Sequence, residues 1–286
     1  MLVSVTQGLA GTPCWRQTGP MLRQPSAITR YISAVAEALS PVVDYALPPR
    51  CALCGDRVAT NTGLCANCWP QLAIPGDPSC KLCQRPFLDG GSQQEAICPQ
   101  CQTKAPQHEG IIAATLYNDA SRQLVLSLKY GKKIGHAQAM ARMISARIHG
   151  LEGEWLLVPV PLHPRRLWRR SFNQAALMVQ EISKHTGLPS VVDGLRRTRN
   201  SAPLGGLGRK ARQSELQGAI SANPAKASRL SGKNIILVDD VVTSGATSAA
   251  CISALKRGGV GKVKIACFAR VLDEQPASPA EWCDNG

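Results

Sequence analysis

Several features that mark common classes of protein are scarce in this chain of 286 residues. No apolar run approaches the roughly 20 residues that span a bilayer, so we expect a soluble protein without a membrane span. Aromatic residues make up only 4% of the chain, which argues against a row of base-stacking platforms for nucleic acid. The N-terminus lacks a basic start, and Thr6 and Gln7 interrupt its apolar part, so it makes a poor signal peptide.

Acidic residues are also scarce. The chain has 19 Asp and Glu against 33 Lys and Arg, which gives a net charge of +14 at pH 7. This excess favours polyanionic partners such as nucleic acid, phosphorylated metabolites or a membrane surface. The alternative is a generally basic surface without a specific partner. The length suits one main domain and an accessory module.

Cysteine, in contrast, is abundant. Twelve cysteines without an export signal indicate metal binding in the reducing cytoplasm, not a disulfide scaffold. Two thiolates on one tight turn face the same cation, and two such turns complete the tetrahedral sulfur shell that zinc adopts. Four Cys-x-x-Cys pairs therefore predict one or two structural Zn²⁺ sites: Cys51 and Cys54, Cys65 and Cys68, Cys80 and Cys83, and Cys98 and Cys101.

The sequence leaves the pairing of these turns open. Taken in order, the first two pairs make one ribbon and the last two another, but interleaved pairing is an alternative. A redox role for one pair competes with zinc, although redox pairs usually occur singly beside a helix. Cys251 and Cys267 are predicted to be core thiols of a helix and a strand.

The most informative segment is residues 235–247, which read IILVDDVVTSGAT. Its apolar start suits a central parallel strand covered on both faces. Asp239 and Asp240 would then lie at the carboxyl end of that strand, where open α/β sheets bind ligands. A loop of small residues follows, whose amides can converge on an anion at the start of a helix: Thr243, Ser244, Gly245, Ala246 and Thr247. Carboxylates beside a phosphate site suit sugar hydroxyls or a metal, so the predicted ligand is a ribose 5-phosphate.

Two other interpretations of this segment compete with a sugar-phosphate site. In the first, the aspartates merely cap the next helix, but a cap would not need a second Asp four residues before the turn. The second, a Walker-type nucleotide site, is excluded because the loop lacks the Gly-Lys-Ser/Thr ending.

Strand and helix patterns alternate from Ile111 to Arg270, which is typical of a mostly parallel sheet. The predicted strands are residues 111–117, 156–160, 190–195, 235–239 and 263–269. The predicted helices are residues 120–129, 137–148, 173–186 and 246–257. We expect a poorly ordered extension at 1–46, a zinc-ribbon module at 47–105, an α/β domain at 106–272 and a tail at 273–286.

A basic turn follows the predicted strand that ends near Val160 and Pro161. It contains Arg165, Arg166, Arg169 and Arg170. Residues 158–215 hold eleven Lys and Arg against three Asp and Glu, so much of the positive charge lies near the predicted site.

The motifs together resemble two known groups of proteins. VDDVVTSGAT is similar to the binding motif of type I phosphoribosyltransferases, which use phosphoribosyl pyrophosphate. Zinc ribbons followed by LKY at 128–130, VPVPL at 158–162, RRSFNQ at 169–174 and VDDVVTSGAT resemble the ComF family over about residues 49–272. The resemblance implies a type I phosphoribosyltransferase-like α/β fold, with a mostly parallel sheet flanked by helices, preceded by a small double zinc-ribbon module. Members of this family are associated with DNA uptake in competent bacteria or with the use of external DNA as a nutrient.

The resemblance also implies roles for individual residues. Asp239 and Asp240 would hold the ribose hydroxyls, residues 243–247 the 5-phosphate, and Arg169 or Arg170 the departing pyrophosphate, which Mg²⁺ also binds. Substrate contacts are implied for Lys129, Val160 and Pro161, with a solvated helix end as the alternative for Lys129.

Three departures from the family pattern stand out. The family usually has Gly where Ser171 stands, Thr-x-x-Gln where residues 201–204 stand, and Asn where Glu215 stands. The last two belong to residues 199–215, which resemble the mobile loop that closes over the substrate. These two differences bear on turnover more than on ligand binding.

The sequence leaves two hypotheses for function. The first is an enzyme that transfers a pentosyl group from phosphoribosyl pyrophosphate. The second is a non-catalytic protein that binds single-stranded DNA or senses a metabolite, with basic residues near Trp168 and Phe172 contacting the strand. Trp168 is interpreted as a packing residue in preference to a base partner. A DNA-uptake helicase or channel protein is the partner that the resemblance implies, and the cytoplasm is the expected compartment.

Overall fold

A computed structural model describes residues 49–59, 63–87, 96–131, 134–198 and 218–272. The chain divides into two compact units, Met1–Leu47 and Pro48–Gly286, and all the described residues belong to the second. The predicted extension at 1–46, the loop at 199–215 and the tail at 273–286 lie outside the described residues.

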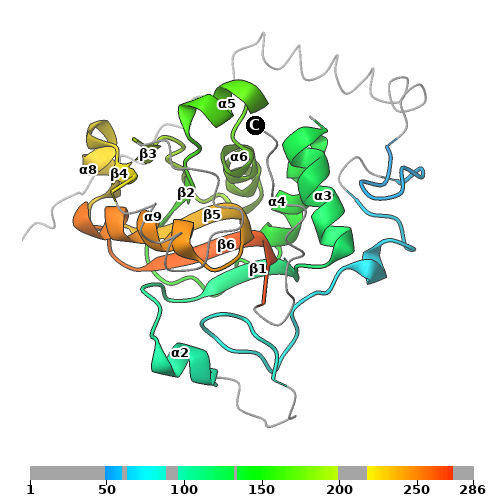
Figure 1. Cartoon of the computed structure of the whole chain (residues 1–286), viewed down its shortest axis with the longest axis horizontal. Helices are drawn as coiled ribbons and strands as arrows, with labels where there is room; N and C mark the ends of the chain where they lie inside the picture. The colour runs from blue at the N-terminus through cyan, green and yellow to red at the C-terminus, as the bar shows by residue number, and fades with distance from the viewer. Residues whose placement is uncertain (1–48, 60–62, 88–95, 132–133, 199–217, 273–286) are drawn as a thin grey trace, which may run out of the picture. The chain divides into compact units, whose positions relative to one another are not determined.

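Parallel strands form a four-stranded sheet in the order β1-β6-β5-β2 (Figure 1). The strands are β1 (Ile111–Leu116), β6 (Val263–Arg270), β5 (Asn234–Val242) and β2 (Trp155–Pro159). Pairing is parallel throughout this sheet. The α/β class expected from the alternating pattern is therefore confirmed.

Helices cover both faces of the sheet (Figure 1). Side chains alternate along β5, so that Ile236 and Val238 pack into one core, while Ile235 and Leu237 pack into a second core. The first core is completed by α3 (Asp119–Tyr130), α4 (Gly135–Ser145) and α6 (Gln174–Thr186), and the second by α9 (Ala246–Arg257). Burial on both faces explains why the sequence of β5 begins as a continuous apolar run.

The strand predicted at 190–195 is wrong. Ser190 forms a single parallel bridge with Leu157, and the chain then turns, with the Gly194 amide donating to the Val191 carbonyl at 3.1 Å. Asp193 and Gly194 supply this turn, as such residues commonly do. The chain continues in a two-stranded antiparallel sheet of β3 (Leu195–Arg197) and β4 (Ile220–Ala222).

The basic turn predicted after β2 is instead a short helix, α5 (Pro164–Arg170). His163 precedes it, and its side chain accepts a hydrogen bond from the Arg165 amide at 3.2 Å. Proline at the first helical position favours a helix start, because its missing N–H has no partner there in any case. The remaining elements are η1 (Trp69–Gln71), α2 (Pro99–Thr103), η2 (Pro224–Lys226) and α8 (Ala227–Leu230).

The cysteine-rich segment before the sheet is attached to the outer edge of β1. The Ile111 amide donates to the Leu82 carbonyl at 3.0 Å, and the Leu116 amide donates to the Ala73 carbonyl at 2.7 Å. These hydrogen bonds use the edge amides of β1 that would otherwise be open to pairing with another chain. The accessory module thus protects the sheet edge that it joins.

Candidate functional site

The eight Cys-x-x-Cys thiols form two separate clusters. In each cluster the four sulfur atoms lie within 4.8 Å of one another. The sets follow chain order, so the interleaved pairing left open by the sequence is excluded: Cys51, Cys54, Cys65 and Cys68 form one, and Cys80, Cys83, Cys98 and Cys101 form the other. Four thiolates at this separation fit a tetrahedral structural Zn²⁺.

The two clusters share one local geometry. A left-handed residue follows the first pair of each: Gly55 at φ 80° and Gln84 at φ 58°. Their amides donate to the carbonyls of Cys51 and Cys80, at 3.0 and 2.8 Å. Glutamine in this conformation costs roughly 1 kcal/mol that glycine does not. The Gln84 side chain, however, accepts a hydrogen bond from the Ala113 amide at 2.6 Å, which joins the second ribbon to β1.

Asp239 and Asp240 lie inside β5, because the strand continues to Val242 beside β6 instead of ending at residue 239 as predicted. On the other side β2 has already ended, and its last bond to β5 runs from the Val160 amide to the Val238 carbonyl. The Asp240 amide points to the same side of β5 as the Val238 carbonyl, where β2 no longer provides a partner. It donates instead to the Asp239 carboxylate at 2.9 Å. The acids therefore lie at the step where one neighbouring strand stops.

The helix-capping interpretation of the two aspartates is wrong. The residue that caps α9 is Gly245, in a left-handed conformation with φ 74°, and no side chain caps this helix. The loop carbonyls of Val242 and Thr243 accept from Arg270 Nη1. Uncapped amides at a helix start, together with the helix dipole, favour an anion.

Lys129 of α3 forms an ion pair with Asp240. Its Nζ lies 3.0 Å from Asp240 Oδ2, and its side chain is only 17% exposed, so it is not a solvated helix end. Burial and the neighbouring Asp240 charge raise the pKa of Asp239 to about 8, while Lys129 acts in the opposite direction. At neutral pH the pair therefore retains a proton on Asp239.

The next residue, Tyr130, contacts the basic helix α5. The Arg170 guanidinium lies 5.3 Å from the centroid of the Tyr130 ring, and its Nη2 donates to the Tyr130 hydroxyl at 3.4 Å. The side chain of Arg169 lies outside what the structure describes. Sequence reasoning quoted Tyr130 only as part of a motif, although its place beside Lys129 was the available signal.

Val160 and Pro161, for which the resemblance implies substrate contact, are both buried. The Val160 carbonyl accepts from Asn173 Nδ2 at 3.0 Å, which links the end of β2 to the start of α6. Arg270 and Asn173 were both missed by sequence reasoning. Their roles depend on hydrogen bonds between distant segments, which no local pattern reveals.

Two family models match parts of the chain. One, described as a double zinc ribbon domain, matches residues 42–102, and the other, described as a phosphoribosyl transferase domain, matches residues 176–284. The DNA utilization protein YhgH of Escherichia coli (strain K12) is 28% identical over 233 residues, covering 74% of this chain and 99% of that protein. Competence protein F of Haemophilus influenzae is 27% identical over 231 residues, covering 77% of this chain and 96% of that protein.

The predicted resemblance to the ComF family is confirmed by these relatives. Competence protein ComFC of Bacillus subtilis is a more distant relative, 24% identical over 211 residues, which cover 70% of this chain and 81% of that protein. Among solved structures, the chain is similar to glutamine phosphoribosylpyrophosphate amidotransferase from B. subtilis at 17% identity and a TM-score of 0.32, over 46% of this chain and 25% of that one. The double zinc-ribbon module and the phosphoribosyltransferase-like fold expected from the sequence are confirmed.

Ser171 departs from the ComF pattern at a position where the backbone explains the usual glycine. It ends α5 with φ 66°, in the left-handed region. Glycine adopts this conformation without steric cost, whereas an L side chain does not. No helix in the described part of the chain has the length and apolar character needed to cross a membrane.

Removing the Lys129 charge should destabilise the protein in a pH-dependent manner. A carboxyl with a raised pKa holds its proton more tightly when folded, so its stabilising contribution is present at low pH and is lost as pH rises through about 8. Without Lys129 that loss is larger, and we expect Lys129→Met to lower the free energy of unfolding by about 3 kcal/mol at pH 9. The decrease should be smaller at pH 6, where Asp239 keeps its proton and only the pair with Asp240 is broken.

Denaturant unfolding at both pH values measures this difference. Lys184→Met is the matched control, because Lys184 forms an exposed pair with Glu181 at 2.6 Å and is 68% exposed. Its loss should cost less than about 0.5 kcal/mol at either pH. Equal destabilisation of Lys129→Met at pH 6 and pH 9 would show that Lys129 does not act on Asp239.

Proposed function

We propose that the protein binds phosphoribosyl pyrophosphate with Mg²⁺ at the carboxyl edge of β5, and that it serves in the use of external DNA. Asp239 and Asp240 accept hydrogen bonds from the ribose hydroxyls. The amides of residues 243–247 bind the 5-phosphate. Arg169 and Arg170 bind the pyrophosphate.

One observation carries this proposal: a carboxyl pair, with Asp240 buried and Asp239 half-buried, comes shortly before a helix whose first turn has no side-chain cap. The carboxyl pair does not cap the helix, because the carboxylates accept hydrogen bonds from the Asp240 and Val241 amides in their own strand. A ligand with hydroxyls at one end and a phosphate at the other fits both. A sugar phosphate has that chemistry.

Carboxylates of this kind also fit Mg²⁺, which is usually held by one or two carboxylates together with phosphate oxygens of the substrate. Asp239 and Asp240 would hold the ion, which supplies charge neutralisation for the pyrophosphate. The chain's own contribution is electrostatic: Arg170, which contacts Tyr130 next to Lys129, would stabilise the charge that develops on the leaving group.

Calorimetric titration with phosphoribosyl pyrophosphate, in the presence and absence of Mg²⁺, tests binding. We expect saturable binding that Mg²⁺ strengthens by at least tenfold. Release of pyrophosphate with ammonia, glutamine or nucleobases as acceptors then tests turnover. Absence of binding in both titrations would refute the proposal, whereas binding without pyrophosphate release would assign a sensing role.

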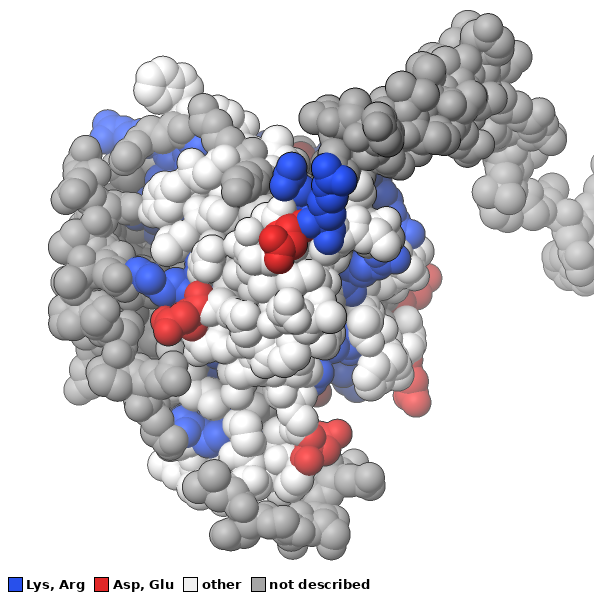
Figure 2. Space-filling view, turned by 90° about the vertical axis from the view of Figure 1, so that its right-hand side faces the viewer, with Lys and Arg blue, Asp and Glu red and all other residues white. Residues whose placement is uncertain are grey.

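A second candidate function is supported by α5. Trp168, for which the sequence favours packing, is 86% exposed, and Leu167 beside it is 43% exposed. The same helix carries Arg165 and Arg166, and base–aromatic stacking beside basic residues binds single strands without sequence preference. On the face drawn in Figure 2, Lys and Arg lie in separate groups with Asp and Glu among them.

A substitution in α5 tests DNA binding there without changing the sugar-phosphate site. Trp168→Ala should weaken binding of a single-stranded oligonucleotide about tenfold, in line with roughly 1–3 kcal/mol per stacked base. A helicase or channel protein of DNA uptake in the cytoplasm is the partner that this function would require. Unchanged oligonucleotide affinity in Trp168→Ala would remove α5 as the DNA surface.

A further inference from the structure

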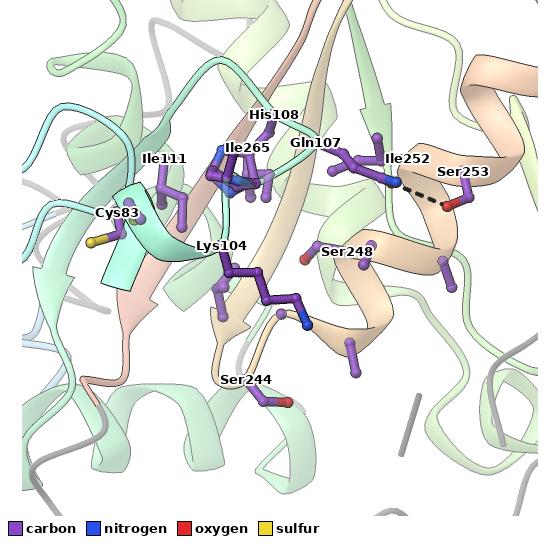
Figure 3. A pocket seen from close by; sticks show the side chains of 18 of the residues that line it. Cys83, Lys104, Gln107, His108, Ile111, Ser244, Ser248, Ile252, Ser253 and Ile265 are labelled. Carbon is purple, nitrogen blue, oxygen red and sulfur yellow. Dashed lines mark hydrogen bonds between the residues drawn. The ribbon is translucent and has the colours of Figure 1, made fainter. Parts of the chain in front are cut away.

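A pocket of about 780 Å³ lies between the second zinc ribbon and α9 (Figure 3). Its walls come from the second zinc ribbon with α2 and the segment after it, from α9 and the turn before it, and from residues of β1, β4, β5 and β6. Asp239, Asp240 and Lys129 do not line it. The pocket therefore does not include the carboxyl pair, although Ser244, Gly245 and Ala246 of the proposed 5-phosphate loop line it.

The position of the ribbon that forms one wall is fixed by hydrogen bonds. The Glu109 amide donates to the Val263 carbonyl at 2.8 Å, and the Ile265 amide donates to the Gly110 carbonyl at 3.0 Å. Ser253 of α9 donates to Gln107 Oε1 at 3.3 Å, across the pocket. The two sides are thus held together at several points.

The described lining residues carry positive charge and no carboxylate. Arg85, Lys104, Arg257 and Arg270 are the cations, and the three serines of the α9 wall add hydroxyls. Within the described ranges, Lys104 and Arg257 form no salt bridge. Figure 3 shows the Lys104 side chain pointing into the pocket, toward the first turn of α9. This lining favours an anion.

Two buried polar atoms of the wall lack partners among the described residues: His108 Nδ1 and Arg270 Nε. Both residues line the pocket, but these two atoms are buried and do not reach its surface. Burial and the Arg270 charge lower the pKa of His108 to about 4. At pH 7 this wall therefore carries the charge of Arg270 and no charge on His108.

The rest of the lining is apolar. Ile111, Ile220, Ile252 and Ile265 line the pocket. The volume lies within the ~300–1,000 Å³ range of small-molecule sites, which typically combine an apolar wall with a few placed polar groups. An apolar wall beside cations and hydroxyls fits a molecule with a flat apolar part and a phosphate.

We propose that this pocket is a second ligand site, specific for a nucleoside 5′-monophosphate. The phosphate lies near Lys104, and the base lies against the isoleucines. The site does not include the carboxyl pair, although it borders the Ser244–Ala246 turn of the proposed 5-phosphate loop.

Titration with thymidine 5′-monophosphate tests the proposal in three forms of the full-length zinc-loaded protein. In the Lys104→Gln, Arg257→Gln variant the dissociation constant should rise at least tenfold, because hydrogen bonds to charged groups are lost. Both side chains are exposed, so folding should be unaffected. In the Asp239→Asn, Asp240→Asn variant binding should match the wild type within twofold.

The two variants distinguish a failure of this proposal from a failure of the proposed sugar-phosphate site. If the aspartate variant loses the nucleotide and the Lys104 and Arg257 variant keeps it, the nucleotide occupies the sugar-phosphate site and the proposal is wrong. Inorganic phosphate or thymidine binding as tightly as the nucleotide would refute the specificity. Binding of a 5′-phosphorylated thymidine tetranucleotide without binding of the mononucleotide would replace a small ligand by a DNA strand.

Discussion

Two equivalents of zinc per chain should be bound by the purified protein, and Cys80→Ser should reduce this to one. The four thiols of each cluster lie within 4.8 Å of one another and belong to that cluster alone, so losing a ligand in the second leaves the first complete. A structural zinc site contributes on the order of 10 kcal/mol to folding of its module. Removing both ions with a strong chelator should therefore unfold residues 48–105 and expose the β1 edge that they cover.

Metal analysis, together with limited proteolysis of the ribbon segment, measures this effect. Cys251→Ala is the matched control, because Cys251 is a buried thiol of α9 and belongs to neither cluster. It should retain two zinc ions. Two ions still bound to Cys80→Ser would show that the second cluster is not a metal site.

Replacing both aspartates, Asp239→Asn with Asp240→Asn, should weaken binding of phosphoribosyl pyrophosphate by at least about 100-fold. Two charge-assisted hydrogen bonds are weakened, each worth roughly 1.5 kcal/mol or more. Because the folded protein already favours a proton on Asp239 at neutral pH, Asp239→Asn alone should not lower the free energy of unfolding at pH 7. Asp240→Asn leaves Lys129 without its carboxylate partner and should lower it. A loss of binding without a loss of stability is the expected signature of Asp239→Asn alone.

The pH dependence adds a second test of the same residues. Hydroxyl groups donate to ionised carboxylates, so wild-type affinity should rise between pH 7 and pH 9 as Asp239 loses its proton near pH 8. Asp239→Asn should remove that rise. Asp193→Asn is the control, since the Asp193 carboxylate is 58% exposed and its nearest cation is Lys226 at 3.6 Å. Equal affinity of the double variant and the wild type would refute the assignment of the carboxyl pair.

Local sequence patterns predicted the central elements well, because burial imposes a pattern along the chain. The helix expected at 246–257 has those bounds, and β1, β2, β5 and β6 lie where apolar runs predicted strands. Predictions failed where the apolar pattern was short or where contacts with other segments determined the local structure. The segment at 190–195 has strand-forming residues, but the turn at Asp193 and Gly194 redirects it into a separate hairpin.

The sequence by itself determined the metal chemistry and the kind of fold, since spacing of cysteines and alternation of apolar runs are local properties that survive without knowledge of contacts. Only the tertiary structure decided which turns share a zinc, and that Lys129 pairs with Asp240. It also decided that Arg270 occupies the carbonyls of the loop before α9. These outcomes depend on which distant segments meet, and the free energy that selects those contacts comes from packing the whole sheet, not from any one segment.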